Sequence, residues 1–528
     1  MNEIPPAARL VDDADWICEP SDFARYGKPL GRFSWLNPKI LWHSRNNVLA
    51  SISGDPTEAA RRAWVTAQRA RLVAEGQPDA IVEDFTIERP ELESFSCMVI
   101  GDTGEGDTSQ YAVVPAFLAA SQNTEFTVIA SDVVYPEGDI NEYIGKFFVP
   151  YAAYPRPIYA VPGNHDWLDG LAGFMRHFCG APPPQEKLLP PRHARRPRTA
   201  MWLHKLFWRR AGELAPETLE QAKMLRGAAA ASGPAQPNMY FCVDTPQLRI
   251  VCIDTGILGR LDYEQGEWLR RVSAGPKPKL MVSGKPMYIG ASFSPRRILP
   301  PEGSEAGNAG FIYDIVTDAA NNYVAMISGD VHNYQRHPVT LDDGRVLQCM
   351  ISGSGGAFMT ATHHIPRIDL PGCTERDVVL FPSRGDSLRA YSVILQHRAL
   401  QLLRRPRRVV RGIPADEAAA IVARRHGLRP DETGTIAKRV SRRSQLLAQI
   451  VFPRRTWFDP EKISEALDWD YPPFFKNFMR IDVRDGVLKV SACGVTGALR
   501  DQDDPVVIDG FEVDLRAAIG AAGVTADE

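Results

Sequence analysis

Four short apolar runs that stop at Asp, Asn or His constrain the fold of this chain most strongly. Residues 323–327 have the length and composition of a buried strand, and they lead into Gly329, Asp330 and His332. Three other runs end in the same way, with residues 95–100 before Asp102, residues 126–130 before Asp132, and residues 158–161 before Asn164, His165 and Asp166. Ligands of open α/β sheets collect outside the carboxyl ends of the strands. We therefore expect an α/β fold in which these four ends converge on one pocket.

The order and spacing of these blocks resemble the calcineurin-like metallophosphoesterases, and within them the purple acid phosphatase branch. Gly163-Asn164-His165-Asp166 matches the Gly-Asn-His-Asp/Glu block of the family completely. Asp132 with Tyr135 matches the tyrosine form of a second block, and Asp102 fits the first. The resemblance covers roughly residues 95–365. It implies a four-layer sandwich of two β-sheets flanked by helices, with helical insertions.

The same resemblance implies a dinuclear metal centre. One ion would be held by four residues, Asp102, Asp132, Tyr135 and His332. The second ion would share Asp132 and add Asn164 and Asp330. The implied cofactors are two divalent or trivalent metal ions, iron with manganese, zinc or a second iron.

Two departures from the family pattern bear on the second ion. Gly284 stands where the family has a His, and Asp330 replaces the first His of the last block. An oxygen-rich site of this kind suits harder ions such as Mn²⁺, Mg²⁺ or Fe²⁺, or is weak or empty. His363 and His364 follow a glycine-rich stretch and are candidates for the missing imidazole. Asp107 is a further candidate because it lies close in sequence to Asp102.

The chemistry implied by the resemblance is hydrolysis of a phosphomonoester or phosphodiester by a metal-bound hydroxide, because metal ions lower the pKa of bound water. His165 would donate a hydrogen bond to the phosphoryl group or a proton to the leaving group, with Asp166 orienting its ring. The rival hypotheses are a catalytically impaired phosphate-binding or membrane-associated regulatory protein on the same fold, and a nuclease.

With 528 residues the chain exceeds the size of a single core. We expect an N-terminal cover or extension over residues 1–94, the phosphoesterase core over 95–384 with an insertion at about 180–237, a basic helical insertion over 385–465, and C-terminal strands completing the core over 466–528. The turn Asp485-Gly486 predicts a hairpin within this last segment. Helices are expected over residues 55–75, 109–122, 216–226 and 415–426.

Composition places the chain among globular proteins, with 44% hydrophobic residues and a net charge of −3. Because the total charge is slightly negative, the arginines of the two insertions predict a polarised surface and an anionic partner, either a membrane surface or a nucleic acid. The eight cysteines form no CxxC pair, which indicates buried free thiols. No signal peptide or apolar run of membrane-spanning length is visible, so we expect a cytoplasmic protein with possible peripheral membrane association. The oligomeric state is left open.

Overall fold

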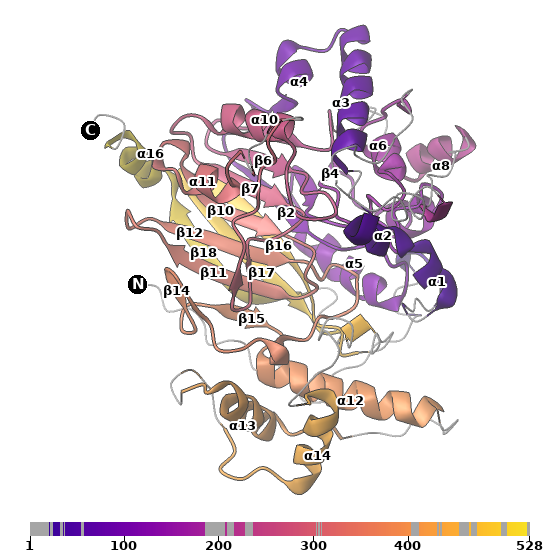
Figure 1. The fold of residues 1–528 in the computed structure, drawn as a ribbon, viewed down its shortest axis with the longest axis vertical. Helices are drawn as coiled ribbons and strands as arrows, with labels where there is room; N and C mark the ends of the chain where they lie inside the picture. The colour runs from indigo at the N-terminus through magenta and orange to yellow at the C-terminus, as the bar shows by residue number, and fades with distance from the viewer. Residues whose placement is uncertain are drawn as a thin grey trace.

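The computed structural model describes residues 21, 25–31, 35, 37–53, 57–184, 206–208, 216–226, 236–301, 304, 307, 309–402, 411–429, 432, 436–453, 464–465, 472–497 and 504–524. Two large β-sheets pack against each other and are flanked by helices (Figure 1). The expected α/β sandwich is therefore confirmed.

The first sheet has six strands in the order β18-β17-β16-β2-β3-β4. Their bounds are β2 Phe95–Ile100, β3 Phe126–Ile129, β4 Ile158–Ala160, β16 Lys476–Arg484, β17 Val487–Val495 and β18 Val506–Asp514. The pairs β2–β3 and β3–β4 are parallel, which directs the ends of three predicted strands to one edge. Strand β16 pairs antiparallel with β2, with Met479 opposite Val99. The predicted hairpin β16–β17 is confirmed, and it extends the sheet that positions Asp102.

The second sheet has eight strands in the order β1-β5-β6-β7-β10-β12-β11-β15. Their bounds are β1 Thr86–Glu88, β5 Phe241–Asp244, β6 Arg249–Ile253, β7 Lys279–Ser283, β10 Tyr323–Ser328, β11 Tyr334–Thr340, β12 Val346–Ser352 and β15 Val379–Phe381. Strand β10 is parallel to both β7 and β12, so the segment after β7 ends beside the segment after β10. Two small hairpins complete the strands, β8 Tyr288–Ile289 with β9 Ser292–Phe293 and β13 Asp369–Leu370 with β14 Cys373–Thr374.

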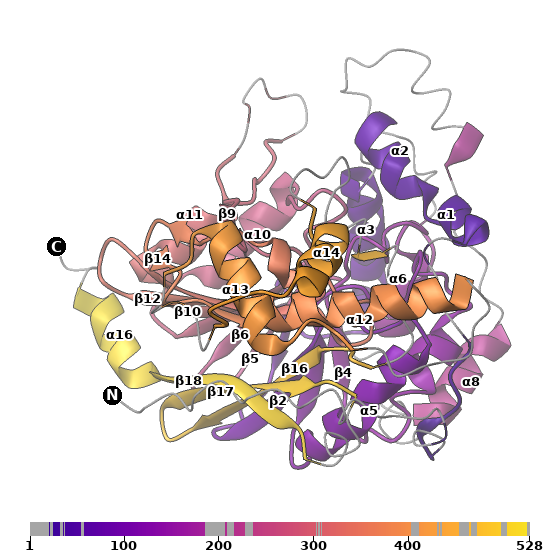
Figure 2. The ribbon, with the colours of Figure 1, turned by 90° about the horizontal axis from the view of Figure 1, so that it is seen from below.

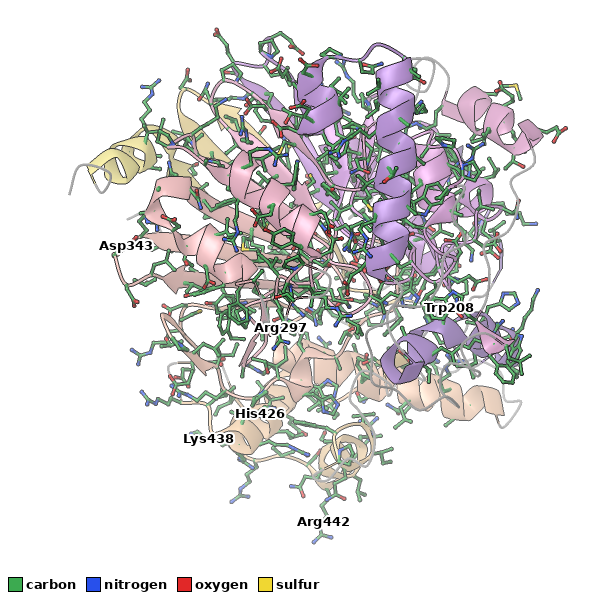
Figure 3. The ribbon with its side chains drawn as sticks, turned by 45° about the horizontal axis from the view of Figure 1, so that its top comes forward. Trp208, Arg297, Asp343, His426, Lys438 and Arg442 are labelled. Carbon is green, nitrogen blue, oxygen red and sulfur yellow. The ribbon has the colours of Figure 1, made fainter. Side chains whose placement is uncertain are left out.

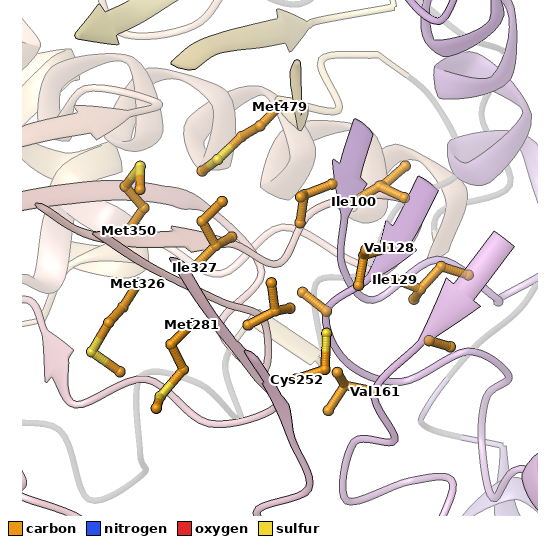
Figure 4. Close-up of a cluster of buried hydrophobic side chains, with 14 of the residues drawn as sticks. Ile100, Val128, Ile129, Val161, Cys252, Met281, Met326, Ile327, Met350 and Met479 are labelled. Atoms are coloured by element: carbon orange, nitrogen blue, oxygen red, sulfur yellow. The ribbon is translucent and has the colours of Figure 1, made fainter. Parts of the chain in front are cut away.

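The core lies between the sheets because their strands are apolar on the inner faces. Ile100 and Val128 approach it from the first sheet and Met281 and Ile327 from the second (Figure 4). All six residues of β2 are buried, and so are all six of β10. Strands covered on both sides read as continuous apolar runs, which is how they appear in the sequence.

Helices cover the outer faces. They comprise α1 Pro38–His43, α2 Arg45–Ser53, α3 Thr57–Ala74, α4 Asp79–Glu83, α5 Thr108–Ala120, α6 Ala172–Phe178, α8 Pro216–Arg226, α10 Tyr263–Ser273, α11 Ile312–Thr317 and α16 Leu515–Val524, with π-helix η3 Ile144–Phe148 and 3₁₀ turns η4 Ala319–Asn321 and η5 Thr362–His364. Helix α3 is tied to the core through buried Arg61, whose guanidinium bonds Asp254 at 2.7 Å and Asp262 at 2.6 Å. The N-terminal region is thus part of the packed structure.

Helices α12 Arg384–Leu402, α13 Ala415–His426 and α14 Arg442–Val451 form a separate layer next to the β15 edge of the second sheet (Figures 1 and 2). Lys438 and Arg442 project outward from this layer (Figure 3). By contrast, Arg425 bonds the backbone carbonyls of Phe452 and Pro453, so part of the basic charge is used internally. The predicted arginines at 192–210 and 404–408 lie outside the described residues.

The cysteine prediction is confirmed for the seven described cysteines, all of which are free and buried. Cys18 lies outside the described residues. In the part of the chain that the structure describes, no helix is long and apolar enough to cross a membrane.

Candidate metal centre

The polar strand ends converge where the two sheets meet. Asp102 follows β2, Asp132 and Tyr135 follow β3, and Asp330 follows β10 of the other sheet. The ends are joined directly, because the backbone N–H of Asp330 donates to Oδ2 of Asp102 at 2.9 Å. Asp102 and Asp330 adopt left-handed backbone conformations, with φ of 56° and 68°. Asp tolerates this region better than most residues, and the conformation turns both carboxylates out of line with their strands.

The phenol oxygen of Tyr135 contacts three other polar side chains, and this group of four is called the first half of the centre. The phenol oxygen lies 3.0 Å from Oδ1 of Asp102, 3.1 Å from Oδ2 of Asp132 and 3.1 Å from Nε2 of His332. All four side chains are buried. Sequence alone predicted this group of four, and the structure brings all of them together.

Burial dominates the electrostatics of the two acids in this first half. Burial raises the pKa of Asp102 well above its ordinary value, and the neighbouring carboxylates of Asp132 and Asp330 raise it further. Burial also raises the pKa of Tyr135, and the charges of Asp102 and Asp132 add to the effect. The ion-pair contact of Asp102 with His332 is long, 3.7 Å, and burial lowers the pKa of His332 to about 3, so this imidazole is neutral near pH 7.

The donor set of the first half fits a metal ion. Two donor atoms at right angles on an ion with bonds of about 2.1 Å lie about 3.0 Å apart. The three contacts of the Tyr135 oxygen have nearly this length. Among the described residues, no three His, Cys, Asp or Glu side chains gather into a metal-binding group by themselves, since here the donors meet through a tyrosine. Two carboxylates, a phenol and a neutral imidazole are suitable ligands for a transition metal ion.

The second half is occupied by a lysine of the chain itself. Nζ of Lys285 donates to Oδ1 of Asn164 at 3.1 Å and forms an ion pair with Oδ1 of Asp330. Burial acts to raise the pKa of Asp330, but the charge and hydrogen bond of Lys285 outweigh it, and the pKa is lowered. These residues do not fit a second metal ion, because the ammonium of Lys285 already binds the two oxygen atoms, of Asn164 and Asp330, that such an ion would need.

Gly284 removes the remaining ligand from this half. Its Cα packs so closely that a Cβ would lie 2.9 Å from Oγ1 of Thr255 and 3.1 Å from the carbonyl oxygen of Pro162. A larger side chain would therefore have to displace neighbouring backbone. His363 does not return the missing imidazole, because its Nδ1 bonds Ser387 at 2.8 Å and its ring packs against Tyr391 of α12.

The other two candidate ligands also have different contacts from those expected. His364 packs on the rings of His363 and Phe452, next to α14, so the hypothesis that this pair completes the centre is wrong. Asp107 caps α5, and its Oδ1 accepts from the N–H of Ser109 at 3.0 Å. A carboxylate at a helix N-cap satisfies backbone donors that would otherwise be unpaired.

His165 lies beside the first half. Its Nδ1 pairs with the carbonyl oxygen of Pro136 at 2.7 Å, and its ring lies 4.8 Å from that of Tyr135. A carbonyl can only accept, so Nδ1 carries the proton and Nε2 holds the lone pair of the neutral ring.

Asp166 does not orient His165 as expected. Its carboxylate accepts from the backbone N–H groups of Val133 at 3.0 Å and Gly163 at 3.1 Å. It therefore fastens the loop after β3 to the loop after β4. The carbonyl of Pro136, which sequence reasoning missed, holds the imidazole.

Close backbone approach at two glycines holds the strand ends together. A Cβ at Gly163 would overlap Oδ1 of Asp132, and one at Gly356 would overlap the carbonyl oxygen of Thr103. The loop that contains Gly356 also accepts hydrogen bonds from the ammonium of Lys476, at the start of β16. The C-terminal strands therefore support the site directly.

An aromatic side chain from the N-terminal region covers the centre. The ring of Trp35 lies 5.7 Å from that of Tyr135 and 5.2 Å from that of His165, in edge-to-face geometry. Its Nε1 donates to Glu105 at 3.2 Å, which explains the buried position of that acid. Neither Trp35 nor Lys285 was singled out by its sequence context, because each contact joins segments far apart in the chain.

Buried acids and a histidine thus lie together at the ends of strands from two packed sheets. Residues 95–334 match the family model of the calcineurin-like phosphoesterases, and this part of the chain is a calcineurin-like phosphoesterase domain.

The solved structures to which the chain is similar are distant in sequence. Purple acid phosphatase PPD1 from yellow lupin (Lupinus luteus) seeds is 11% identical, with a TM-score of 0.36 over 80% of this chain and 54% of that one. This chain therefore spans about half of the lupin protein. GAP50, the anchor in the inner membrane complex of Plasmodium, is 8% identical, with a TM-score of 0.36 over 81% of this chain and 95% of that one. PhoD is 8% identical, with a TM-score of 0.33 over 83% of this chain and 78% of that one. No curated protein matches significantly.

Proposed function

We propose that this chain is a metal-dependent hydrolase of phosphomonoesters or phosphodiesters. The observation that carries the proposal is the contact of one phenol oxygen, that of Tyr135, with Asp102, Asp132 and His332 at 3.0–3.1 Å. These four residues would hold one transition metal ion. Such an ion would offset the negative charge of a phosphoester and lower the pKa of a water molecule.

The protein groups around that position have distinct tasks in this proposal. Asp132 is fixed by the backbone N–H of His165, which donates to Oδ1 at 2.8 Å, so its other oxygen is directed toward Tyr135. The ammonium of Lys285 supplies a positive charge on the opposite side. His165 donates a proton from Nε2 to the leaving group when its ring is doubly protonated, since Nδ1 remains bonded to Pro136.

The direct test is hydrolysis of p-nitrophenyl phosphate and bis(p-nitrophenyl) phosphate by protein loaded separately with Fe, Mn and Zn. We expect turnover of at least one substrate and a loss of about 10²–10⁴-fold in His165→Asn, which lacks a general acid. Asp343→Asn is a matched surface control, because Asp343 lies in an exposed turn at the edge of the molecule (Figure 3). Absence of turnover with all three metals would contradict the proposal.

Phosphate binding without turnover is the second candidate, and Lys285 is the observation in its favour. An ammonium in place of a metal ion retains charge for anion binding but cannot lower the pKa of a water molecule as a metal ion does. The same assay distinguishes the two functions. Tight binding of inorganic phosphate with no turnover of either ester would select the binding protein.

An anionic partner of the basic helical layer stays a prediction. Of its described residues, Arg424, Lys438, Arg442 and Arg443 are exposed, although Arg424 also bonds the carbonyl of Lys438 and Arg443 that of Gly412. Sedimentation with anionic vesicles and a gel shift with nucleic acid at low salt would test it. Binding through exposed charges should weaken as salt rises, because screening acts over about 8–10 Å near physiological ionic strength.

A further inference from the structure

Lys285 joins the two residues that would otherwise face a second metal ion. Its Nζ lies 3.1 Å from Oδ1 of Asn164 and is ion-paired with Asp330. We propose that this ammonium replaces the second metal ion, so that the centre holds one ion and uses Lys285 to bind the phosphoryl oxygens. The inference rests on the proposed function. In it, Lys285 binds the phosphoryl group of the substrate on the Asn164 and Asp330 side of the centre.

The backbone fixes this lysine at the centre. The N–H of Lys285 donates to Oγ1 of Thr255 at 3.0 Å. The same hydroxyl would lie 2.9 Å from a Cβ at Gly284, so the absence of a side chain at 284 and the position of Lys285 depend on each other. Gly259 makes room for the lysine stem, because a Cβ there would lie 3.0 Å from Cδ of Lys285.

Charge around Asp330 also disfavours a metal ion in this half. Arg296 lies on the same side, with its Nε bonded to the carbonyl oxygen of Pro286 at 2.9 Å. A Cβ at Gly259 would contact both cations, 2.6 Å from Nη1 of Arg296 and 3.0 Å from Cδ of Lys285, which shows how near they are to each other. A divalent ion placed between Asn164 and Asp330 would be repelled by both.

The chemistry of an ammonium suits the proposed task. Lysine has three N–H donors, and Asn164 and Asp330 account for two of them. The side chain is 16% exposed, so it is not fully enclosed by the protein. Lysine binds phosphates as a point charge. It contributes a fixed charge that does not depend on metal supply.

Metal stoichiometry is the first test, and it requires no activity. Purified apo protein is saturated with Mn²⁺, passed through a desalting column and analysed for metal and protein. One ion per chain is expected. Two ions per chain would overturn the inference, and so would none.

Binding of inorganic phosphate to the Mn²⁺-loaded protein, measured by calorimetry, is the second test. Lys285→Met should bind phosphate at least about 10-fold more weakly while keeping its single Mn²⁺, and Lys285→Arg should stay within about 3-fold of wild type because it keeps the charge. Lys489→Met is the matched control, since Lys489 is exposed on β17 and pairs with Glu512. If Lys285→Met does not fold, Lys285→Gln replaces it under the same criteria.

Wild-type phosphate affinity in folded Lys285→Met or Lys285→Gln would overturn the inference. Its failure can be distinguished from failure of the proposed function. One ion per chain and Lys285-dependent phosphate binding without hydrolysis would remove the proposed activity and keep the inference. Hydrolysis with two ions per chain would keep the proposed activity and remove the inference.

Discussion

The two halves of the centre differ in how their acids are neutralised. Around Tyr135, the carboxylates of Asp102 and Asp132 are buried beside a phenol and a neutral imidazole. Around Lys285, the carboxylate of Asp330 is paired with an ammonium. A buried carboxylate that lacks a cationic partner either takes up a proton or requires another cation. The comparison teaches that a candidate metal site is recognised by unbalanced buried charge as much as by its donor atoms.

The largest expected effect comes from breaking the half around Tyr135. His332→Ala should weaken binding of Mn²⁺ or Fe by more than about 100-fold, since loss of residues that merely orient a ligand already costs about 10–100-fold. Metal content after dialysis against limiting free metal measures this. His364→Ala is the matched control and should keep wild-type metal content. Equal loss in both variants would mean that the fold, and not ligation, was damaged.

Converting the other half into a metal site would sharpen the comparison. Lys285→Ala combined with Asp330→His removes the ammonium and returns an imidazole, which suits Zn²⁺. We expect the Zn²⁺ content to rise from one ion per chain toward two. Asp330→His alone should remain at one, because Lys285 still lies against Asn164. A second ion in the single variant would show that Lys285 does not exclude it.

Charge removal should affect the stability of the two halves with opposite sign. In metal-free protein, Asp330→Asn leaves the ammonium of Lys285 without its carboxylate and should lower the free energy of unfolding by about 1–3 kcal/mol, less than for a fully buried pair. Asp102→Asn replaces a buried carboxyl group whose charged form is disfavoured by burial and by the neighbouring carboxylates, and should be neutral or stabilising. Urea unfolding of both variants at neutral pH tests this. A larger loss in Asp102→Asn would contradict the assigned charges.

The smallest effect on stability and phosphate binding is expected at Thr255, whose hydroxyl accepts from the backbone N–H of Lys285. Thr255→Val removes the acceptor of this backbone N–H and should cost about 1 kcal/mol of stability, with a change in phosphate affinity of only about 2–5-fold. Its metal content should stay at the wild-type value. A fall in metal content would show that Thr255 also supports the half around Tyr135.

Much of the fold was predictable because its elements are locally encoded. Residues 95–100 form a strand with the predicted bounds, and Ala415–His426 forms a helix ended by Gly427 in a left-handed conformation. The meeting of the polar side chains around Tyr135 was predictable because each lies in the loop after an apolar strand, whereas their role as metal ligands is implied only by the family resemblance. Local pattern is sufficient when a residue's position follows from its own strand.

The contacts of Lys285 and Trp35 at the centre were not predictable from local pattern. Lys285 reaches Asn164 across 121 positions and Trp35 reaches Glu105 across 70, and no local pattern encodes such contacts. One signal was present: the chain loses an imidazole at Gly284 next to a lysine and gains an acid at Asp330. A lysine and an acid at neighbouring strand ends indicate an ion pair. No comparable signal in the sequence indicated that His363 packs against α12 and not at the centre.

The pairing of β2 with β16 has a consequence for synthesis of the protein. Ser96 and Asp482, which are bonded across these strands, are 386 positions apart. At about 5–20 residues per second, the ribosome needs roughly 20–80 s to supply the second strand after the first has been made. During that time β2, whose six residues are all apolar or small and become buried, has one unpaired edge. Unpaired apolar edges recruit other chains, so translation is the period in which this protein is most exposed to aggregation, and slower growth or added chaperones should raise its soluble yield.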